Sequence, residues 1–234
     1  MPKRALLVGI TYEKTSYQLT GCINDIKNIG NVLKKIGYDH IVVLKEKEAT
    51  KANIIKQLNE LVSTEADQLW FHYSGHGSHI IDTSGDELDG QDEVICPIDY
   101  NTAGVLTDDL LNQIIQKTKS PMIVIMDCCH SGTNLDLKYH YDGNNIKEND
   151  CNIEQKIIEI SGCMDGQKSA DTVINKKWQG AMTAALLDTL EKNNYSISVI
   201  DLISKMKHYL KEHDYDQIPQ VTSSIEITED TKFL

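Results

Sequence analysis

The chain has 234 residues, of which 40% are hydrophobic and 25% charged, and these values are typical of a globular protein rather than a collagen-like or disordered one. One compact domain commonly accommodates about this length, so we expect a single domain. The formal net charge of −12 excludes nucleic acid and anionic membranes as natural partners and favours cationic ligands, although a negative surface can also serve only solubility.

The first apolar run is "ALLVGI", residues 5–10, which follows Lys3 and Arg4. It is too short for the apolar part of a secretion signal and continues into polar residues, so we predict the first core strand. No other run approaches the roughly 18 apolar residues that span a bilayer. We therefore expect a soluble, cytoplasmic protein.

Apolar runs bounded by turn residues predict strands, and amphipathic spacing between them predicts helices. In chain order the prediction is strand 5–10, helix 23–36, strand 40–44, helix 50–63, strands 69–73 and 94–98, helix 107–118, strands 122–126 and 156–161, helices 179–192 and 196–213, and strand 221–227. Near-continuous apolar strands alternating with helices predict an α/β fold, with a mostly parallel central sheet and helices on both faces.

The segment 138–152, "KYHYDGNNIKENDCN", is polar, rich in Asn and without periodicity. This composition predicts a mobile connection. It would join a larger part, residues 1–137, to a smaller part, residues 153–234, within the one domain.

Two predicted strands end in a similar way, "LWFHYSGHGSH" and "MIVIMDCCHSG". Side chains alternate between the faces of a strand, so Ser74 shares a face with His76. For the same reason Asp127 shares a face with Cys129. Sites in open parallel sheets gather at the carboxyl ends of the strands, so we expect these four polar groups to converge.

A thiol becomes a good nucleophile beside an imidazole, and neighbouring glycines leave backbone N–H groups able to hold an oxyanion. Cys129 and His76 have this character, and Gly77 and Gly132 are suitably placed. A structural cysteine near a core histidine would be the simpler reading of either fragment alone. Two such strand ends in one chain favour catalysis. The six cysteines show no paired C-x-x-C motifs, so zinc is not expected.

Five segments together resemble the type I metacaspases, which are caspase-like cysteine peptidases of clan CD. They are "GCINDI" (21–26), "HYSGHG" (72–77), "DGQDEVICPIDY" (89–100), "DCCHSG" (127–132) and "SGCMDGQKSAD" (161–171). The resemblance implies a caspase-like fold and a catalytic dyad of His76 and Cys129, because the family's nucleophile directly precedes His-Ser-Gly. Cys128 would then face the interior. No third catalytic side chain is evident, so the fold itself must orient the dyad. No N-terminal prodomain is expected, since the sequence begins at the first predicted strand.

The resemblance also places the pocket for the residue before the scissile bond (P1) at Asp25, Ser74 and Asp127. Two carboxylates suit a guanidinium or an ammonium, and Arg fits better than Lys because its planar fork can be held bidentately. We therefore expect protein or peptide substrates cleaved after Arg or Lys, and not after Asp. The alternative for Asp25 is a carboxylate that stabilises a helix N-terminus.

The acidic stretch "DTSGDELDGQDE", residues 82–93, is rich in hard oxygen ligands. It is not an EF-hand, because Glu87 occupies the sixth loop position, which needs Gly. The resemblance implies instead a Ca²⁺ site, formed by Asp92, Asp108, Asp109 and Asp136. Asp108 and Asp109 follow Thr107 and equally fit the first turn of a helix.

Self-cleavage would have to use lysine, because the single arginine, Arg4, lies in the first predicted strand. The candidates are Lys138, Lys147 and Lys156. His72 and His79 are expected to fill packing or loop positions, and a monomer is expected. One alternative function is a catalytically silent caspase-like adaptor or calcium-responsive binding module. A redox role for the adjacent Cys128 and Cys129 is weaker, because adjacent cysteines form strained disulfides.

Overall fold

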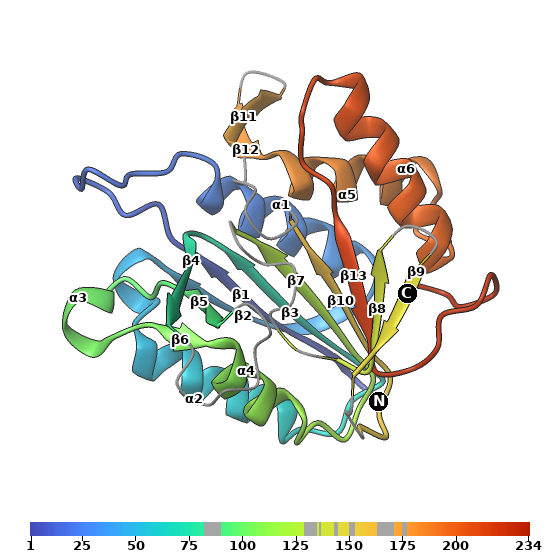
Figure 1. Ribbon diagram of the computed structural model, residues 1–234, viewed down its shortest axis with the longest axis horizontal. Helices are drawn as coiled ribbons and strands as arrows, with labels where there is room; N and C mark the ends of the chain where they lie inside the picture. The colour runs from blue at the N-terminus through green and yellow to red at the C-terminus, as the bar shows by residue number, and fades with distance from the viewer. Residues whose placement is uncertain are drawn as a thin grey trace.

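The centre of the protein is an eight-stranded sheet (Figure 1). A computed structural model describes residues 1–81, 90–128, 135, 137–142, 145–149, 153–162, 171–174 and 177–234. Across the sheet, the strands are β2 (Tyr38–Lys45), β1 (Lys3–Gly9), β3 (Gln68–Ser74), β7 (Met122–Asp127), β10 (Ile157–Ser161), β13 (Gln220–Ser223), β8 (Tyr139–Asp142) and β9 (Asn145–Glu148).

The sheet is mostly parallel, as the sequence predicts. Strands β2, β1, β3, β7 and β10 run parallel to one another, whereas β13, β8 and β9 are each antiparallel to the preceding strand in the sheet. All six residues of β7 are buried. A strand that is covered on both faces has no side exposed to solvent, so it does not alternate apolar with polar residues. This explains why the strands appear in the sequence as continuous apolar runs.

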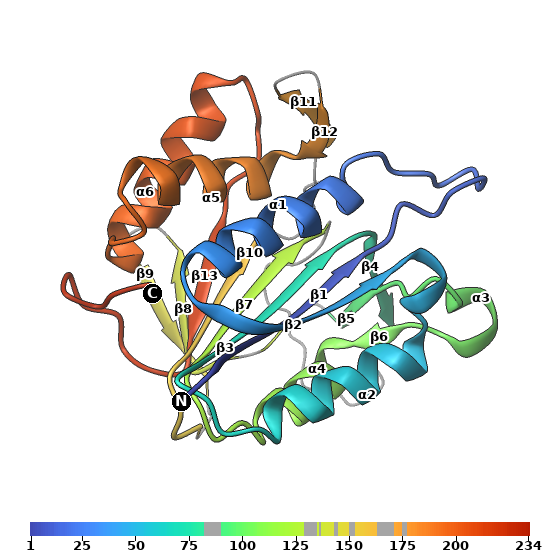
Figure 2. The same ribbon diagram turned by 180° about the vertical axis from the view of Figure 1, so that it is seen from behind.

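Helices cover both faces of the sheet (Figures 1 and 2). One face carries α1 (Cys22–Lys35), α5 (Ala181–Lys192) and α6 (Val199–Glu212), and the other carries α2 (Lys51–Val62) and α4 (Asp108–Ile115). Successive residues of β3 serve different cores, with Trp70 in the first and Phe71 in the second. The α/β fold with two helical layers is therefore confirmed.

Hydroxyl side chains begin three of these helices. Thr50, Thr107 and Ser198 each accept a hydrogen bond from a backbone N–H in the first turn, at 3.3, 3.3 and 3.2 Å. Such caps satisfy donors that have no partner within the helix. The observed helices start and end within a few residues of the predicted ranges.

The segment 138–152, which was predicted as a mobile connection, contains two strands. Strands β8 and β9 form an antiparallel hairpin that extends the sheet beyond β13. Tyr141 packs against the core under α6, but the described side chains of β9 are exposed. An edge hairpin buries few side chains, so it produces no apolar run for a sequence pattern to detect.

Short elements complete the fold. Strands β4 (Gly77–Ile81), β5 (Gln91–Ile95) and β6 (Leu106–Thr107) form a separate three-stranded sheet, and β11 (Asp171–Ile174) pairs with β12 (Lys177–Gly180). The predicted strand 94–98 thus belongs to the small sheet and ends before Pro97. A helix, α3 (Tyr100–Ala103), and a 3₁₀ turn, η1 (Glu46–Glu48), were not predicted.

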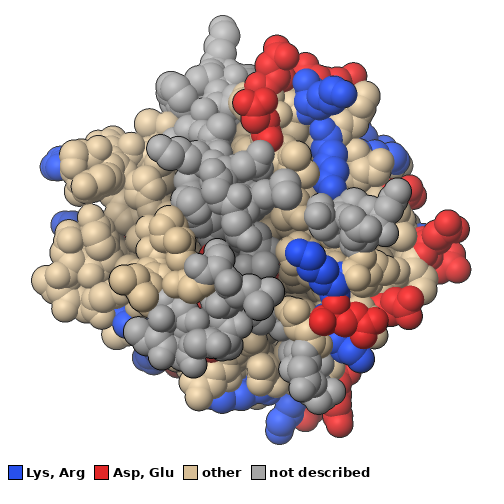
Figure 3. Space-filling model, viewed as in Figure 1, with Lys and Arg blue, Asp and Glu red and all other residues tan. Residues whose placement is uncertain are grey.

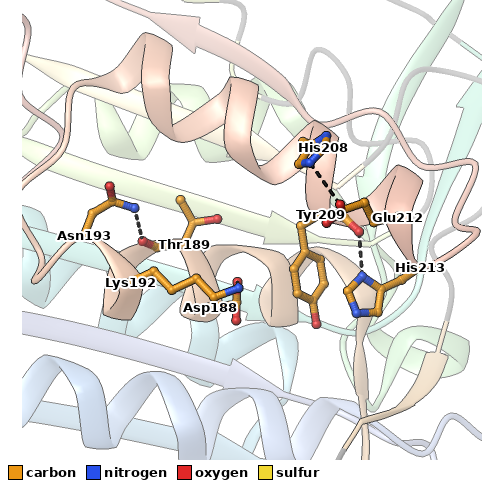
Figure 4. Close-up of polar contacts among 8 residues, drawn as sticks. All are labelled: Asp188, Thr189, Lys192, Asn193, His208, Tyr209, Glu212 and His213. Carbon is orange, nitrogen blue, oxygen red and sulfur yellow. Dashed lines mark hydrogen bonds and ion pairs between the residues drawn. The ribbon is translucent and has the colours of Figure 1, made fainter.

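Charged side chains on the view in Figure 3 gather away from the β1–α1 loop and α3, where the surface is mostly uncharged. At the ends of α5 and α6, surface pairs join Lys192 to Asp188 at 2.8 Å and His208 to Glu212 at 3.1 Å (Figure 4). Exposed pairs of this kind contribute little to stability.

Each helix within the described ranges is too short or too polar to traverse a bilayer.

Candidate active site

The carboxyl ends of three parallel strands meet at one edge of the sheet. The register places Gly9 of β1 beside Ser74 of β3, and Ser74 beside Asp127 of β7. The prediction that Ser74 and Asp127 converge is therefore confirmed. Cys128 is 1% exposed and packs in the core beneath α2 and α4, so its predicted interior position is confirmed as well.

Helix α1 brings Asp25 to the same edge. A side chain at Gly9 would collide with this helix, since a Cβ there would lie 2.7 Å from Ile26 Cδ1 and 2.9 Å from the Cys22 carbonyl oxygen. The glycine lets the first turn of α1 pack directly on the end of β1. Asp25 is completely buried, and its Oδ2 accepts a hydrogen bond from Ser74 Oγ at 2.8 Å.

Helix α5 completes the cluster with two residues that the sequence did not identify, Gly180 and Thr183. The Gly180 N–H donates to Asp25 Oδ1 at 2.9 Å. Asp127 Oδ2 accepts from the N–H and the hydroxyl of Thr183, at 3.0 and 2.6 Å. Asp127 thus caps α5, whose own N-cap residue, Gly180, has no side chain to do so. Both residues lie in the predicted helix 179–192, but nothing in the sequence pattern connects them to the two carboxylates.

We call Asp25 and Asp127 the acidic pair. Gly180 lies close to both of their carboxylates. A Cβ at Gly180 would overlap Asp127 Oδ2, lie 2.9 Å from Asp127 Cγ and lie 3.1 Å from Asp25 Oδ2. Its φ of −65° suits any residue, so the glycine is needed for space and not for conformation. Asp25 is 0% and Asp127 4% exposed, and the cluster therefore places two buried carboxyl groups at the sheet edge.

His76 lies two residues beyond β3 and is half-buried. Its Nε2 is 2.6 Å from the carbonyl oxygen of Tyr17. Because that oxygen only accepts, Nε2 carries the proton and Nδ1 is left as the basic nitrogen of the neutral ring. The predicted lack of a third catalytic side chain is consistent with this arrangement, in which a backbone carbonyl orients the ring.

Cys129 and Gly132 lie outside the described residues. The chain that leads to Cys129 nevertheless leaves the sheet beside the chain that leads to His76, because the Gly75 N–H donates to the Asp127 carbonyl oxygen at 3.4 Å. Gly77 directly follows His76 and begins β4, opposite Ile95. The two predicted motifs are therefore neighbours at the point where each leaves its strand.

The proposed calcium ligands are only partly brought together. Asp92 and Asp108 are both buried, and Asp108 accepts hydrogen bonds from the N–H groups of Glu93 and Asp109 at 3.0 and 2.8 Å. Burial, with a smaller effect of the Asp92 charge, raises the pKa of Asp108 to about 6. The Asp92 carboxylate is therefore near enough for its charge to act on Asp108.

The rest of this site is less complete. Asp109 is exposed in the first turn of α4, beneath the Thr107 cap, as the helix-start alternative predicted. Asp136 lies outside the described residues. Over the ranges that the structure describes, no group of three or more His, Cys, Asp or Glu side chains could hold a metal ion.

His72 and His79, which were predicted to have no catalytic role, occupy packing or surface positions. His72 is fully buried in β3, and neither of its ring nitrogens has a hydrogen-bond partner in the described part of the chain. Burial lowers its pKa to about 3, so it is neutral. His79 lies exposed in β4. His72 therefore fills the core, as expected.

Comparisons with known proteins agree with this geometry. The family model described as "Metacaspase, peptidase C14 domain" matches residues 3–138. Metacaspase-1 of Meyerozyma guilliermondii is 35% identical over 95% of this chain and 69% of its own length. Metacaspase-1 of Arabidopsis thaliana is 36% identical over 88% of this chain and 64% of its own length. The chain thus spans about two thirds of these relatives.

A solved structure shows the same fold. Protein GSU0716 from Geobacter sulfurreducens superimposes with a TM-score of 0.73 and 25% sequence identity. The match covers 96% of this chain and 94% of that protein. The overall fold is therefore shared over nearly the whole chain.

Proposed function

The chain belongs to the metacaspases, a family of cysteine peptidases, and we propose that it is a calcium-dependent endopeptidase that cleaves after Arg or Lys through Cys129 and His76. One observation supports the dyad most directly. The hydrogen bond between Gly75 and Asp127 holds the two motif chains together one residue before His76 and two residues before Cys129.

In the proposed reaction, Cys129 attacks the scissile carbonyl after losing its proton to His76. The Tyr17 carbonyl supports this role, since it keeps the proton of the neutral ring on Nε2 and leaves Nδ1 to accept another. The imidazolium then protonates the leaving amine, and water hydrolyses the thioester. Backbone N–H groups near Gly77 would stabilise the oxyanion.

The acidic pair supports the proposed preference for a basic P1 residue. Both carboxylates are buried at the carboxyl edge of the sheet, beside Ser74, which lies two residues before His76. A guanidinium placed between them would neutralise charge that is otherwise concentrated there, and its fork can bind carboxylate oxygens bidentately.

A peptidase assay tests the proposal as a whole. The purified protein would be given fluorogenic peptides with Arg, Lys or Asp at P1, with and without calcium. We expect turnover of the Arg and Lys peptides only, with Arg preferred. No turnover of any of these peptides by folded, calcium-loaded protein would contradict the proposal and favour the silent adaptor.

Calcium dependence is proposed from the buried pair Asp92 and Asp108, with Asp109 and Asp136 as further ligands. A divalent cation would stabilise the ionised carboxylates that burial otherwise disfavours. We expect a chelator to lower activity at least about tenfold and added calcium to restore it. Binding of calcium should also raise the melting temperature.

Asp108→Asn should raise the calcium concentration that gives half-maximal activity by at least about tenfold, because it removes one buried charge from the site. Glu60→Gln is the matched control, since Glu60 is exposed on α2, where it pairs with Lys56 at 4.0 Å and accepts a hydrogen bond from Gln57 Nε2 at 2.9 Å. If neither the activity nor the melting temperature changed on adding a chelator or calcium, the proposed calcium site would be wrong.

If the protein cleaves itself, the structure ranks the three candidate lysines. Lys147 is exposed on the edge strand β9. The carbonyl of Lys138 accepts from the Asn149 N–H at 2.8 Å, in the same hairpin. The carbonyl of Lys156 accepts from the Met122 N–H at 2.8 Å, and its Nζ donates to the Lys232 carbonyl oxygen at 2.6 Å. Cleavage at Lys156 would require the central sheet to open.

We therefore expect a first cut after Lys147, slower than cleavage of an Arg peptide. Mass spectrometry of calcium-treated protein would identify the new termini, and Lys147→Gln should abolish the first product while Lys156→Gln leaves it unchanged. Initial cleavage after Lys156, or an unchanged product pattern in Lys147→Gln, would contradict the ranking.

A further inference from the structure

We infer that Tyr12 is a positioning residue for His76, holding both the backbone and the ring of the histidine in place for the thiol. The inference rests on the proposed function in that it takes His76 as the catalytic base. Tyr12 lies in the loop between β1 and α1, far from His76 in sequence.

The first contact is with the backbone of His76. The Tyr12 hydroxyl oxygen accepts a hydrogen bond from the His76 N–H at 3.1 Å, and the same hydroxyl donates to the Cys96 carbonyl oxygen. The hydroxyl of Tyr73, 3.1 Å away, donates to the His76 carbonyl oxygen at 2.8 Å. Both backbone polar groups of His76 are thus bound by buried tyrosines.

The second contact is with the imidazole. The ring of Tyr12 lies 4.7 Å from that of His76, centroid to centroid and tilted by 41°. The ring of Tyr17 approaches at 6.4 Å and 90°, and its carbonyl meets Nε2. One loop therefore provides a ring contact, a backbone hydrogen bond and the acceptor that sets the tautomer.

The loop is itself held in place. Tyr12 has a φ of 51°, a left-handed conformation that is costly for a bulky residue and persists only where the surroundings impose it. Beside it, the N–H of Thr11 donates to Glu46 Oε1 at 2.7 Å, and the Thr11 hydroxyl donates to the same oxygen. These bonds tie the loop to the end of β2.

Gly75 provides the space for this contact. A Cβ there would lie 2.6 Å from the Tyr73 hydroxyl oxygen and 3.2 Å from that of Tyr12. Burial raises the pKa of both tyrosines well above 10, so their hydroxyls remain protonated donors at any working pH. A glycine directly before the histidine thus permits the tyrosine pair to reach it.

Tyr12→Phe tests the inference, because it keeps the ring and removes only the hydroxyl. Tyr38→Phe is the matched control, since Tyr38 is also buried and its hydroxyl makes a hydrogen bond of 3.0 Å to Gln68, at the amino end of the sheet. We expect Tyr12→Phe to lower kcat roughly 10- to 100-fold with KM changed less than about twofold, since a small misplacement of a catalytic group has effects of this size. The acidic limb of the kcat/KM profile should move to higher pH, because a displaced imidazole stabilises the thiolate less.

A measurement without turnover keeps the inference separate from the proposed function. The imidazole NMR signal of His76, assigned with His76→Gln, should shift in Tyr12→Phe and stay unchanged in Tyr38→Phe. An unchanged signal in Tyr12→Phe, or equal losses of kcat in the two variants in proportion to their melting temperatures, would overturn the inference. A wild-type protein without peptidase activity would refute the proposed function, while the NMR comparison would still decide the positioning role.

Discussion

Cys129→Ala and His76→Ala are expected to abolish calcium-stimulated hydrolysis of a peptide with Arg at P1, each lowering kcat by roughly 10³- to 10⁶-fold. Alanine at position 129 leaves no nucleophile, and alanine at position 76 leaves no base to take its proton. KM should change little, because neither side chain is proposed to hold the P1 residue.

Cys129 and His76 should also act as one catalytic unit. When two groups act in the same step, removing the second costs little once the first is gone. The double variant is therefore expected to retain about the same residual activity as Cys129→Ala alone. Independent losses that multiply would show that His76 acts in some other step, such as substrate binding.

Cys128→Ala is the matched control for the nucleophile. Cys128 directly follows β7, and its buried side chain packs with the core beneath α2 and α4, so its loss should lower stability while leaving kcat near the wild-type value. A Cys128→Ala protein that folds but is inactive, beside an active Cys129→Ala, would reverse the assignment of the nucleophile.

The sequence predicts the strands that carry this site because burial on both faces makes them apolar throughout. The two strands both end at the carboxyl edge of the sheet, which predicts that Ser74 and Asp127 converge there, and the register confirms it. Two-residue periodicity is a local property, so it survives without knowledge of the fold. The same local signal places Cys128 on the other side of the chain from Asp127, in the core beneath α2 and α4.

Other contacts of the site have no local signal. Gly180 and Thr183 reach the acidic pair from α5, and the Gly180 contact to Asp25 spans 155 positions in sequence. The acceptor for His76 Nε2 is a backbone carbonyl, which every residue possesses. The sequence therefore identifies the side chains that carry charge or a nucleophile, whereas the contacts that orient them depend on tertiary packing.

Asp25→Asn is expected to lower kcat/KM for an Arg substrate by roughly 10²-fold or more, because removing one partner of a buried charge pair commonly costs about 2–5 kcal/mol. The amide keeps the size of the side chain and an oxygen that can accept from the Gly180 N–H. Activity should fall by much less on a peptide with citrulline at P1, which has the shape of Arg without its charge.

Asp201→Asn controls for the alternative role of Asp25. Both residues are carboxylates in the first turn of a helix, Asp25 in α1 and Asp201 in α6, so both substitutions remove a favourable interaction with a helix N-terminus. If that interaction were the whole role of Asp25, the two variants would lose similar stability. Asp25→Asn would then affect the Arg and citrulline peptides equally.

Gly180→Ala would disturb the same proposed pocket without changing its charge. The new methyl group would overlap Asp127 Oδ2, which is fixed by two hydrogen bonds from Thr183. Either the carboxylate or the start of α5 must move, and because both belong to the proposed pocket, kcat/KM for the Arg peptide should fall by about the same factor as in Asp25→Asn. A Gly180→Ala protein with wild-type preference for Arg over citrulline would show that the acidic pair only joins α5 to the sheet. Selectivity for charge therefore separates a binding pocket from a structural contact, even where both substitutions lower stability.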